Sequence, residues 1–196
     1  MKFTLKTALA ALVMFAWTGS TAMAQTATLV SDDHDGIVVR FDFSDPELQE
    51  VETEDGIFLR PRVAGDTPLL RAGAPDLSKV DATLMIGAQT GTALEVVDVE
   101  YVEFDDVAVV PSKGNLYRNV NPADMPFVQG APYTQDAFYP AAPAAIQTPF
   151  VQRGVRGQSI WAYPFQYNAV TGVLRAHTSI TVRIVETDAA PVNPAV

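Results

Sequence analysis

The segment from Ser31 to Asp42 has the residue types of a calcium loop. Counted from Ser31, it places side-chain oxygens at positions 1, 3 and 5, Gly36 at position 6 and Asp42 at position 12. Position 12 of such a loop is normally Glu, and both flanks should be helices. An alternating strand pattern follows Gly36 instead, which favours a turn between two strands. We therefore expect no metal site here, with Asp33, Asp35 and Asp42 facing solvent.

Residues that catalyse hydrolysis are scarce in this sequence. It contains no cysteine and no serine in a Gly-x-Ser-x-Gly turn, so an activated nucleophile is not indicated. His34 is predicted to lie in a wet turn and His177 to face solvent on a strand, and their spacing does not suit zinc. Two carboxylates could act together as in a glycosidase, but in so acidic a chain such pairs are expected without any catalytic role. We expect neither enzymatic activity nor a cofactor.

Lys113 and Arg118 are the basic residues of a long segment, residues 111–140, that shows no sustained helix or strand period. The segment has five prolines and two glycines, yet too much apolar and aromatic mass for disorder. Much of this mass comes from Leu116, Tyr117, Met125, Phe127, Tyr133, Phe138 and Tyr139. We predict an ordered loop that these aromatic residues attach to the body of the protein. Lys113 and Gly114 are predicted to set its first turn.

The first 24 residues have the pattern of an export signal. Lys2 and Lys6 precede an apolar run over residues 8–17, and Ala22-Met23-Ala24 is a small-x-small cleavage signal. We expect a bacterial-type signal peptide over residues 1–24, and a secreted or periplasmic mature chain that begins at Gln25. No other stretch is long enough to span a bilayer. Because cysteine is absent, export brings no disulfide.

The predicted mature chain is strongly acidic. Without Lys2 and Lys6, 11 basic residues stand against 23 acidic ones, a formal charge of −12. This charge argues against binding to nucleic acid or to anionic lipid, and it agrees with solubility after export. The length suits one domain with a hydrophobic core. We place this domain at residues 25–186, followed by a Pro/Ala-rich tail over residues 187–196.

Many short alternating segments, separated by Gly, Pro and Asp turns, indicate an all-β fold, either a sandwich or a barrel. The last strand has the most regular alternation. Its even-numbered residues from 174 to 184 are predicted to face the core and its odd-numbered residues to face solvent. The core is predicted to contain Phe41, Val99, Trp161, Phe165, Ile180 and Val182.

Three local features lead to narrower predictions. Asp55-Gly56 predicts a hairpin turn, with Ile57, Leu59 and Val63 toward the core. Residues 161–167 are predicted to form one strand with its odd-numbered aromatic residues on one face, near a sheet edge or strand end because of Pro164. Arg156 is interpreted as structural, with its guanidinium donating to loop carbonyls.

Several motifs resemble the propeptide of gingipain-type cysteine proteases. Residues 106–114 (DVAVVPSKG) and 121–130 (NPADMPFVQG) look like segments of that family. The likeness is closest over residues 153–158 followed by residues 165–175. The resemblance covers residues 73–185 well and the first strands by pattern. Ala169 and Ser78 depart from the family at turn positions where proline is usual, which affects local rigidity and leaves the fold intact.

This resemblance implies a jelly-roll-like antiparallel β-sandwich with one long ordered loop. It also implies a prodomain that keeps a caspase-like His/Cys protease latent and assists its folding. In the family an inhibitory loop carries a basic residue into the specificity pocket, and that position falls on Arg118. The candidate protease-binding residues are Arg118, Tyr117, Asn119, Leu116 and Lys113.

The chemistry of arginine and the shape of the loop also favour Arg118 as the residue that enters the pocket. A guanidinium forks onto a carboxylate with two parallel hydrogen bonds that lysine cannot reproduce. An extended loop adds main-chain hydrogen bonds to the edge of a protease cleft. Without the resemblance, Arg118 is simply an exposed arginine, which is the ordinary state of a charged residue.

Two functions are therefore compared. The first is a secreted inhibitor or detached prodomain that binds a gingipain-like protease. The second is a non-inhibitory structural or adhesive β-sandwich that has kept the prodomain fold. No protease sequence follows Val196, so we expect a free-standing propeptide-like domain or a fragment of a zymogen. A neighbouring gene for a secreted His/Cys protease would favour the first function.

Overall fold

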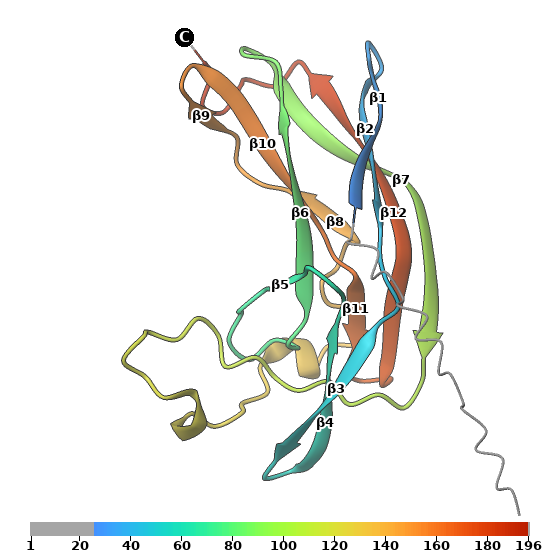
Figure 1. The fold of residues 1–196 in the computed structure, drawn as a ribbon, viewed down its shortest axis with the longest axis vertical. Helices are drawn as coiled ribbons and strands as arrows, with labels where there is room; N and C mark the ends of the chain where they lie inside the picture. Colours follow the sequence, from blue (N-terminus) through green and yellow to red (C-terminus); the bar gives the residue numbers. More distant parts are fainter. Residues whose placement is uncertain (1–25, 196) are drawn as a thin grey trace, which may run out of the picture.

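The computed structural model describes residues 26–195, so the predicted signal peptide lies outside the described residues (Figure 1). No helix in residues 26–195 is long and apolar enough to cross a membrane. The strands are β1 (Thr26–Asp33), β2 (Gly36–Asp42), β3 (Glu47–Thr53), β4 (Gly56–Arg62), β5 (Thr67–Pro68), β6 (Ser78–Met85), β7 (Gly91–Phe104), β8 (Ala144–Ile146), β9 (Phe150–Gln152), β10 (Val155–Ala162), β11 (Phe165–Asn168) and β12 (Val173–Thr187). Two short 3-10 helices, η1 (Pro122–Asp124) and η2 (Ala131–Tyr133), lie in the long loop.

The strands form two five-stranded sheets and a separate hairpin. One sheet has the order β1-β2-β12-β11, with β7 paired to the other side of β12. The second has the order β5-β6-β10-β8, with β9 also paired to β10, and β3 pairs with β4. All of these strand pairs are antiparallel. The prediction of an all-β sandwich is confirmed.

The main core lies between the two sheets. Strands β2 and β12 supply it from one sheet and β8 and β10 from the other, which is the arrangement that two packed sheets require. Phe41, Ile180 and Val182 are fully buried in it, as predicted, and Val99 is half-buried against it. Its buried members are Val39, Phe41, Ala144, Ile160, Ala162, Ile180, Val182 and Ile184.

A second core lies at the lower end of the sandwich, where the long loop leaves it (Figure 1). Phe165 is fully buried in this cluster, as predicted. Tyr133 and Tyr139 of the long loop pack against the cluster, so part of the loop belongs to the hydrophobic interior. Its buried members are Val63, Leu77, Val107, Val109, Phe165, Tyr167, Leu174 and Ala176.

The prediction that Trp161 lies in the core is wrong. Strand β10 ends at Ala162, and after Tyr163 and Pro164 the chain enters β11 in the other sheet. The even-numbered residues Ile160 and Ala162 face the core in β10, whereas the odd-numbered Phe165 does so in β11. Residues 161–167 therefore span the end of β10 and the start of β11, two strands with opposite inward parity. Trp161 is half-buried, with the Lys79 ammonium 4.4 Å from its ring centroid.

The prediction that His177 faces solvent is also wrong. The pairing register of β12 shifts between His177 and Ser179, so Thr178 is an extra residue in the ladder and is exposed. His177 is only 3% exposed, and its Nδ1 lies 2.8 Å from the carbonyl oxygen of Tyr163. Burial lowers the pKa of its imidazole below the ordinary value. The segment that joins β10 to β11 lies against this part of β12, which the alternation alone does not reveal.

The β3–β4 hairpin forms at the predicted turn but extends beyond the core (Figure 1). Leu59 packs against the second core and Val63 is buried in it, as predicted. Ile57 was predicted to face the core with them, but 66% of its surface is exposed. It lies next to the turn, where the hairpin extends past the second core.

Arg156 is structural, as predicted. Only 2% of its surface is exposed, and its guanidinium donates to the carbonyls of Gly87 at 2.6 Å, Thr90 at 2.8 Å and Val192 at 2.9 Å. The third contact shows that the C-terminal tail docks on the sandwich. The backbone N–H of Ala195 also donates to the Ala88 carbonyl, at 3.1 Å.

Candidate functional site

Within the long loop, the two ends of residues 112–130 are held at Gly73. The Gly73 N–H donates to the Ser112 carbonyl at 2.9 Å, and the Gly130 N–H donates to the Gly73 carbonyl at 2.7 Å. Gly73 has φ +76°, and a Cβ on Gly130 would lie 2.9 Å from the Gly73 carbonyl oxygen. Larger residues at either position would push the two segments of this junction apart. Residues 113–129 thus leave the body and return to it at one place, and we call them the projecting loop.

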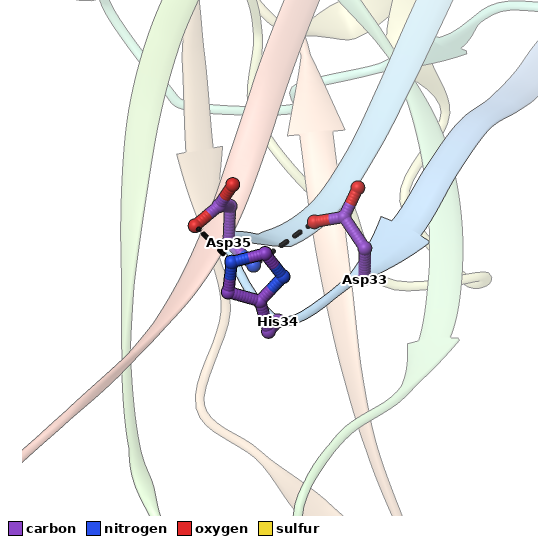
Figure 2. Close-up of side chains that lie close together, drawn as sticks. All are labelled: Asp33, His34 and Asp35. Carbon is purple, nitrogen blue, oxygen red and sulfur yellow. Dashed lines mark hydrogen bonds and ion pairs between the residues drawn. The ribbon is translucent and has the colours of Figure 1, made fainter.

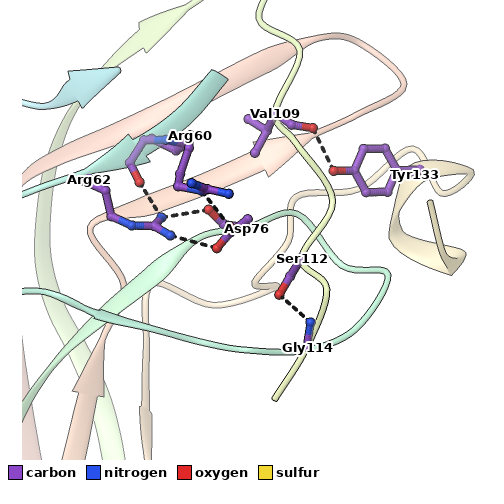
Figure 3. A network of polar contacts seen from close by, with 8 residues as sticks. Arg60, Arg62, Asp76, Val109, Ser112, Gly114 and Tyr133 are labelled. Atoms are coloured by element: carbon purple, nitrogen blue, oxygen red, sulfur yellow. Dashed lines mark hydrogen bonds and ion pairs between the residues drawn. The ribbon is translucent and has the colours of Figure 1, made fainter. Parts of the chain in front are cut away.

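The segments beside the projecting loop are tied to the second core (Figure 3). Tyr133, just after the loop, donates its hydroxyl to the Val109 carbonyl at 2.7 Å, and its ring meets that of Tyr167 edge-on at 6.4 Å. Burial raises the pKa of the Tyr133 phenol, which keeps it protonated as a donor. The prediction that aromatic residues attach the long segment to the body is confirmed for Tyr133.

Two arginines of β4 fix the chain that runs beside the loop (Figure 3). The Asp76 carboxylate accepts from Arg60 Nε and from Arg62 Nη2, both at 2.8 Å. The Asp76 N–H in turn donates to the Val110 carbonyl at 2.9 Å, just before the loop begins. Asp76 is mostly buried, so this pairing links the β3–β4 hairpin firmly to the base of the loop.

Arg118 lies at the tip of the projecting loop. The Val120 N–H donates to the Tyr117 carbonyl at 3.0 Å, which closes a turn with Arg118 and Asn119 as its two central residues. Both are exposed, and Tyr117 is 83% exposed. Within residues 26–195, Arg118 forms no ion pair. The tip is therefore a tight turn, not an extended strand, and it offers an unpaired guanidinium to solvent.

Lys113 is engaged inside the loop. Its ammonium donates to the Pro122 carbonyl at 2.7 Å and lies 4.0 Å from the centroid of the Phe127 ring. The next residue, Gly114, has φ +79° and donates its N–H to the Ser112 hydroxyl at 3.1 Å. The contact between Ser112 and Gly114 and the positive φ of Gly114 bend the chain where the sequence predicts the first turn, whereas the contacts of Lys113 reach across the loop. The five predicted site residues share one loop, with Leu116 half-buried below the tip.

A groove of about 420 Å³ lies beside the projecting loop. Leu70, Leu116 and Phe127 give it apolar walls, and Arg60 and Asp76 contribute polar ones. It separates the loop from the body over part of its length. The loop is therefore supported at its base and by its own side chains, while its tip is accessible.

The candidate calcium ligands lie far from this loop, at the β1–β2 turn (Figures 1 and 2). The ligand atoms of Asp33, His34 and Asp35 lie within 4.8 Å of one another, and all three residues are exposed. His34 Nε2 lies 3.1 Å from an Asp35 carboxylate oxygen, and Asp33 accepts from the Asp35 N–H. Asp42 is paired with Arg40 at 2.8 Å and lies at the other end of β2. The predicted turn between two strands is confirmed, and the length of β2 separates Asp42 from Asp33, His34 and Asp35.

Calcium should leave the stability of the chain unchanged. The three clustered side chains are solvated neighbours in one turn, so binding a cation there would join no separate elements of the fold. Thermal melts in millimolar calcium and in excess chelator should coincide. A rise in Tm of several degrees with calcium would contradict this expectation.

The sequence as a whole matches the Propeptide_C25 family model over residues 20–194. The chain belongs to this family. It is 33% identical over 165 residues to Gingipain R2 of Porphyromonas gingivalis, covering 84% of this chain and 22% of that protein. It is 36% identical over 149 residues to Gingipain R1 of the same species, covering 76% of this chain and 15% of that protein. The Propeptide_C25 chain thus spans less than a quarter of the length of these relatives.

Two solved structures are similar to this chain, and the first supports the family assignment. A structure described as a complex of the pro- and mature domains of RgpB from P. gingivalis matches with TM-score 0.81 and 33% identity, covering 86% of this chain and 88% of the other. A structure on the zymogenic latency of gingipain K matches with TM-score 0.69 and 20% identity, covering 86% and 96% of the two chains. The second likeness supports the fold alone.

Two features of the site are not predicted from the sequence. Gly73 as the point where both loop ends meet depends on pairing between distant segments, which no local pattern encodes. The pairing of Asp76 with Arg60 and Arg62 had a usable signal: two arginines alternate on one face of a predicted strand, and an aspartate lies in the loop that follows. Alternating arginines on a strand face call for an acidic partner.

Proposed function

We propose that this chain is a secreted propeptide-like domain that binds and inhibits a gingipain-like cysteine protease through Arg118. In this proposal it keeps the protease latent and assists its folding. Membership of the Propeptide_C25 family supports the general role, and the similar RgpB structure is described as a complex of pro- and mature domains. The leader pattern over residues 1–24 supports export.

The observation that carries the proposal is the state of Arg118. It is an exposed arginine without an ion pair in residues 26–195, at the tip of a loop whose two ends are fixed at Gly73. Inside a protease pocket its planar guanidinium would form two parallel hydrogen bonds with a carboxylate. A loop that is already ordered loses less conformational entropy on binding than a flexible peptide does.

The turn at the tip would explain why the loop inhibits the protease and is not cut rapidly by it. Proteases bind substrates as extended strands, whereas Tyr117 and Val120 hold Arg118 and Asn119 in a closed turn. The bond after Arg118 would then lie away from the attack geometry, and a displacement of ~1 Å costs on the order of a hundredfold in rate. The domain would occupy the pocket without supplying a good substrate.

Purified chain should inhibit an Arg-specific gingipain-type protease. Gingipain R2, freed of its own prodomain, would be incubated with increasing amounts of the chain, and residual hydrolysis of a small arginine substrate would be measured. We expect activity to fall with a saturable dose dependence. Full activity at every concentration would reject the proposal and favour the non-inhibitory structural or adhesive β-sandwich.

A further inference from the structure

The projecting loop contains two basic side chains, and they are in opposite states. Arg118 is exposed at the tip, whereas Lys113 is half-buried and bonded within the loop. Both were candidate protease contacts on sequence grounds. The Lys113 ammonium already donates to a carbonyl and lies over an aromatic ring of the same loop. The contacts of Lys113 therefore point inward, to the shape of the loop.

The hydrogen bond of Lys113 connects two parts of the loop on either side of its tip. Its acceptor is the carbonyl of Pro122, so the contact joins the two ends of a shorter span that contains the whole tip turn from Tyr117 to Val120. The same carbonyl accepts the N–H of Met125 at the end of η1. The ammonium thus links the rising part of the loop to η1, which begins its return path.

Phe127 extends this link further along the return path. The Lys113 ammonium lies 4.0 Å from the Phe127 ring centroid, within the range of an attractive cation–π contact. Phe127 is half-buried and lines the groove beneath the loop together with Lys113 and Leu116. One side chain therefore contacts both Pro122 and Phe127, on the far side of the tip from Lys113 itself.

We propose that Lys113 is a positioning residue, whose bridge to Pro122 and Phe127 holds the tip turn closed and so presents Arg118 in its inhibitory geometry. This inference rests on the proposed function and assigns Lys113 a role within the loop instead of contact with the protease. Gly73 fixes where the loop begins and ends. Lys113 fixes the shape of the part that lies beyond that junction.

The first test measures the loop in the free domain, with trypsin as the probe. Trypsin needs an extended, accessible arginine, so cleavage after Arg118 reports how often the turn opens. Lys113→Met keeps a long apolar side chain but removes the charge and the donor. It should speed cleavage after Arg118 about fivefold, the effect of losing one net hydrogen bond. Lys113→Arg, which can donate to Pro122 and stack on Phe127, should restore most of the protection.

Matched variants separate this effect from general destabilisation. Lys79 also lies over an aromatic ring and pairs with Asp81 on β6, outside the loop, so Lys79→Met should leave cleavage after Arg118 unchanged. Phe127→Leu removes the ring and should speed cleavage to a smaller extent. Melting temperatures of all four variants should match that of the wild type. An unchanged cleavage rate in Lys113→Met, by mass spectrometry of the products, would overturn the inference.

The second test uses a gingipain-type protease. Lys113→Met should inhibit it about fivefold more weakly than the wild type and should itself be cut after Arg118 more rapidly. If Lys113→Met inhibits like the wild type while Arg118→Ala does not, the positioning role is wrong and the proposed function stands. If the wild type itself fails to inhibit, the proposed function is wrong. The positioning role of Lys113 is then wrong as well, because the loop does not inhibit a protease.

Discussion

Ile180→Ala should lower the free energy of unfolding by about 2–5 kcal/mol. Ile180 is fully buried in β12, in the core between the two sheets. It stands in register with Phe41 on β2 and with Val99 on β7, so its side chain is surrounded by both neighbouring strands and by the facing sheet. Truncation would leave a cavity that so closely packed a site cannot collapse to fill. Urea unfolding followed by fluorescence gives the value.

The hairpin supplies a matched control. Ile57 has the same side chain, but 66% of its surface is exposed, so Ile57→Ala should change the free energy of unfolding by less than about 0.5 kcal/mol. Both variants make the same Ile→Ala change in the unfolded chain. The difference between their free energies of unfolding therefore reports the folded state. A loss below ~0.5 kcal/mol in Ile180→Ala would mean that the inward face of β12 has been assigned to the wrong residues.

Arg118→Ala should weaken inhibition of a gingipain-type protease by at least about tenfold, which corresponds to about 1.4 kcal/mol. A protease–inhibitor contact of standard size buries roughly 1,600 Å², but a few central side chains dominate its energy. Arg118 is the exposed cation at the tip of the projecting loop, so it is the residue best placed to enter a pocket. Because it makes no ion pair in residues 26–195, its loss should hardly move Tm.

Arg153 is the control for this variant. It is also exposed in a turn, between β9 and β10, and that turn lies at the opposite end of the molecule from the projecting loop (Figure 1). Arg153→Ala removes the same charge from the acidic domain and should leave the inhibition constant unchanged. Arg118→Lys should weaken inhibition as well, because an ammonium cannot form the planar fork. Equal inhibition constants for Arg118→Ala and the wild type would contradict the assignment.

The fold could be predicted because alternation at period two marks a strand with one buried face. This rule found Phe41, Ile180 and Val182, which are fully buried. It failed for Trp161 because the chain changes sheet after Ala162, and for His177 because the ladder contains an extra residue at Thr178. Both errors arise where pairing between distant strands interrupts a local pattern. Such interruptions depend on the partner strands, which one segment of sequence does not specify.

The position of the long loop in the chain could be predicted, but the contacts that hold the loop in shape could not. The lack of periodicity, the prolines and the aromatic residues located the loop, and the family resemblance directed attention to Arg118. The inward role of Lys113 follows from where Pro122 and Phe127 lie in space, and the two cations look equivalent in sequence. Arg156 was predictable because an arginine between strand residues and next to glycine is expected to donate to nearby carbonyls.

Competition kinetics test most directly whether Arg118 occupies the specificity pocket. The apparent inhibition constant of the wild-type chain would be measured on gingipain R2 over a wide range of a small arginine substrate. If Arg118 fills the pocket, this constant should rise linearly with substrate concentration, because the substrate and the chain exclude each other. An inhibition constant that does not depend on substrate concentration would place the chain outside the pocket and contradict the proposed role of Arg118.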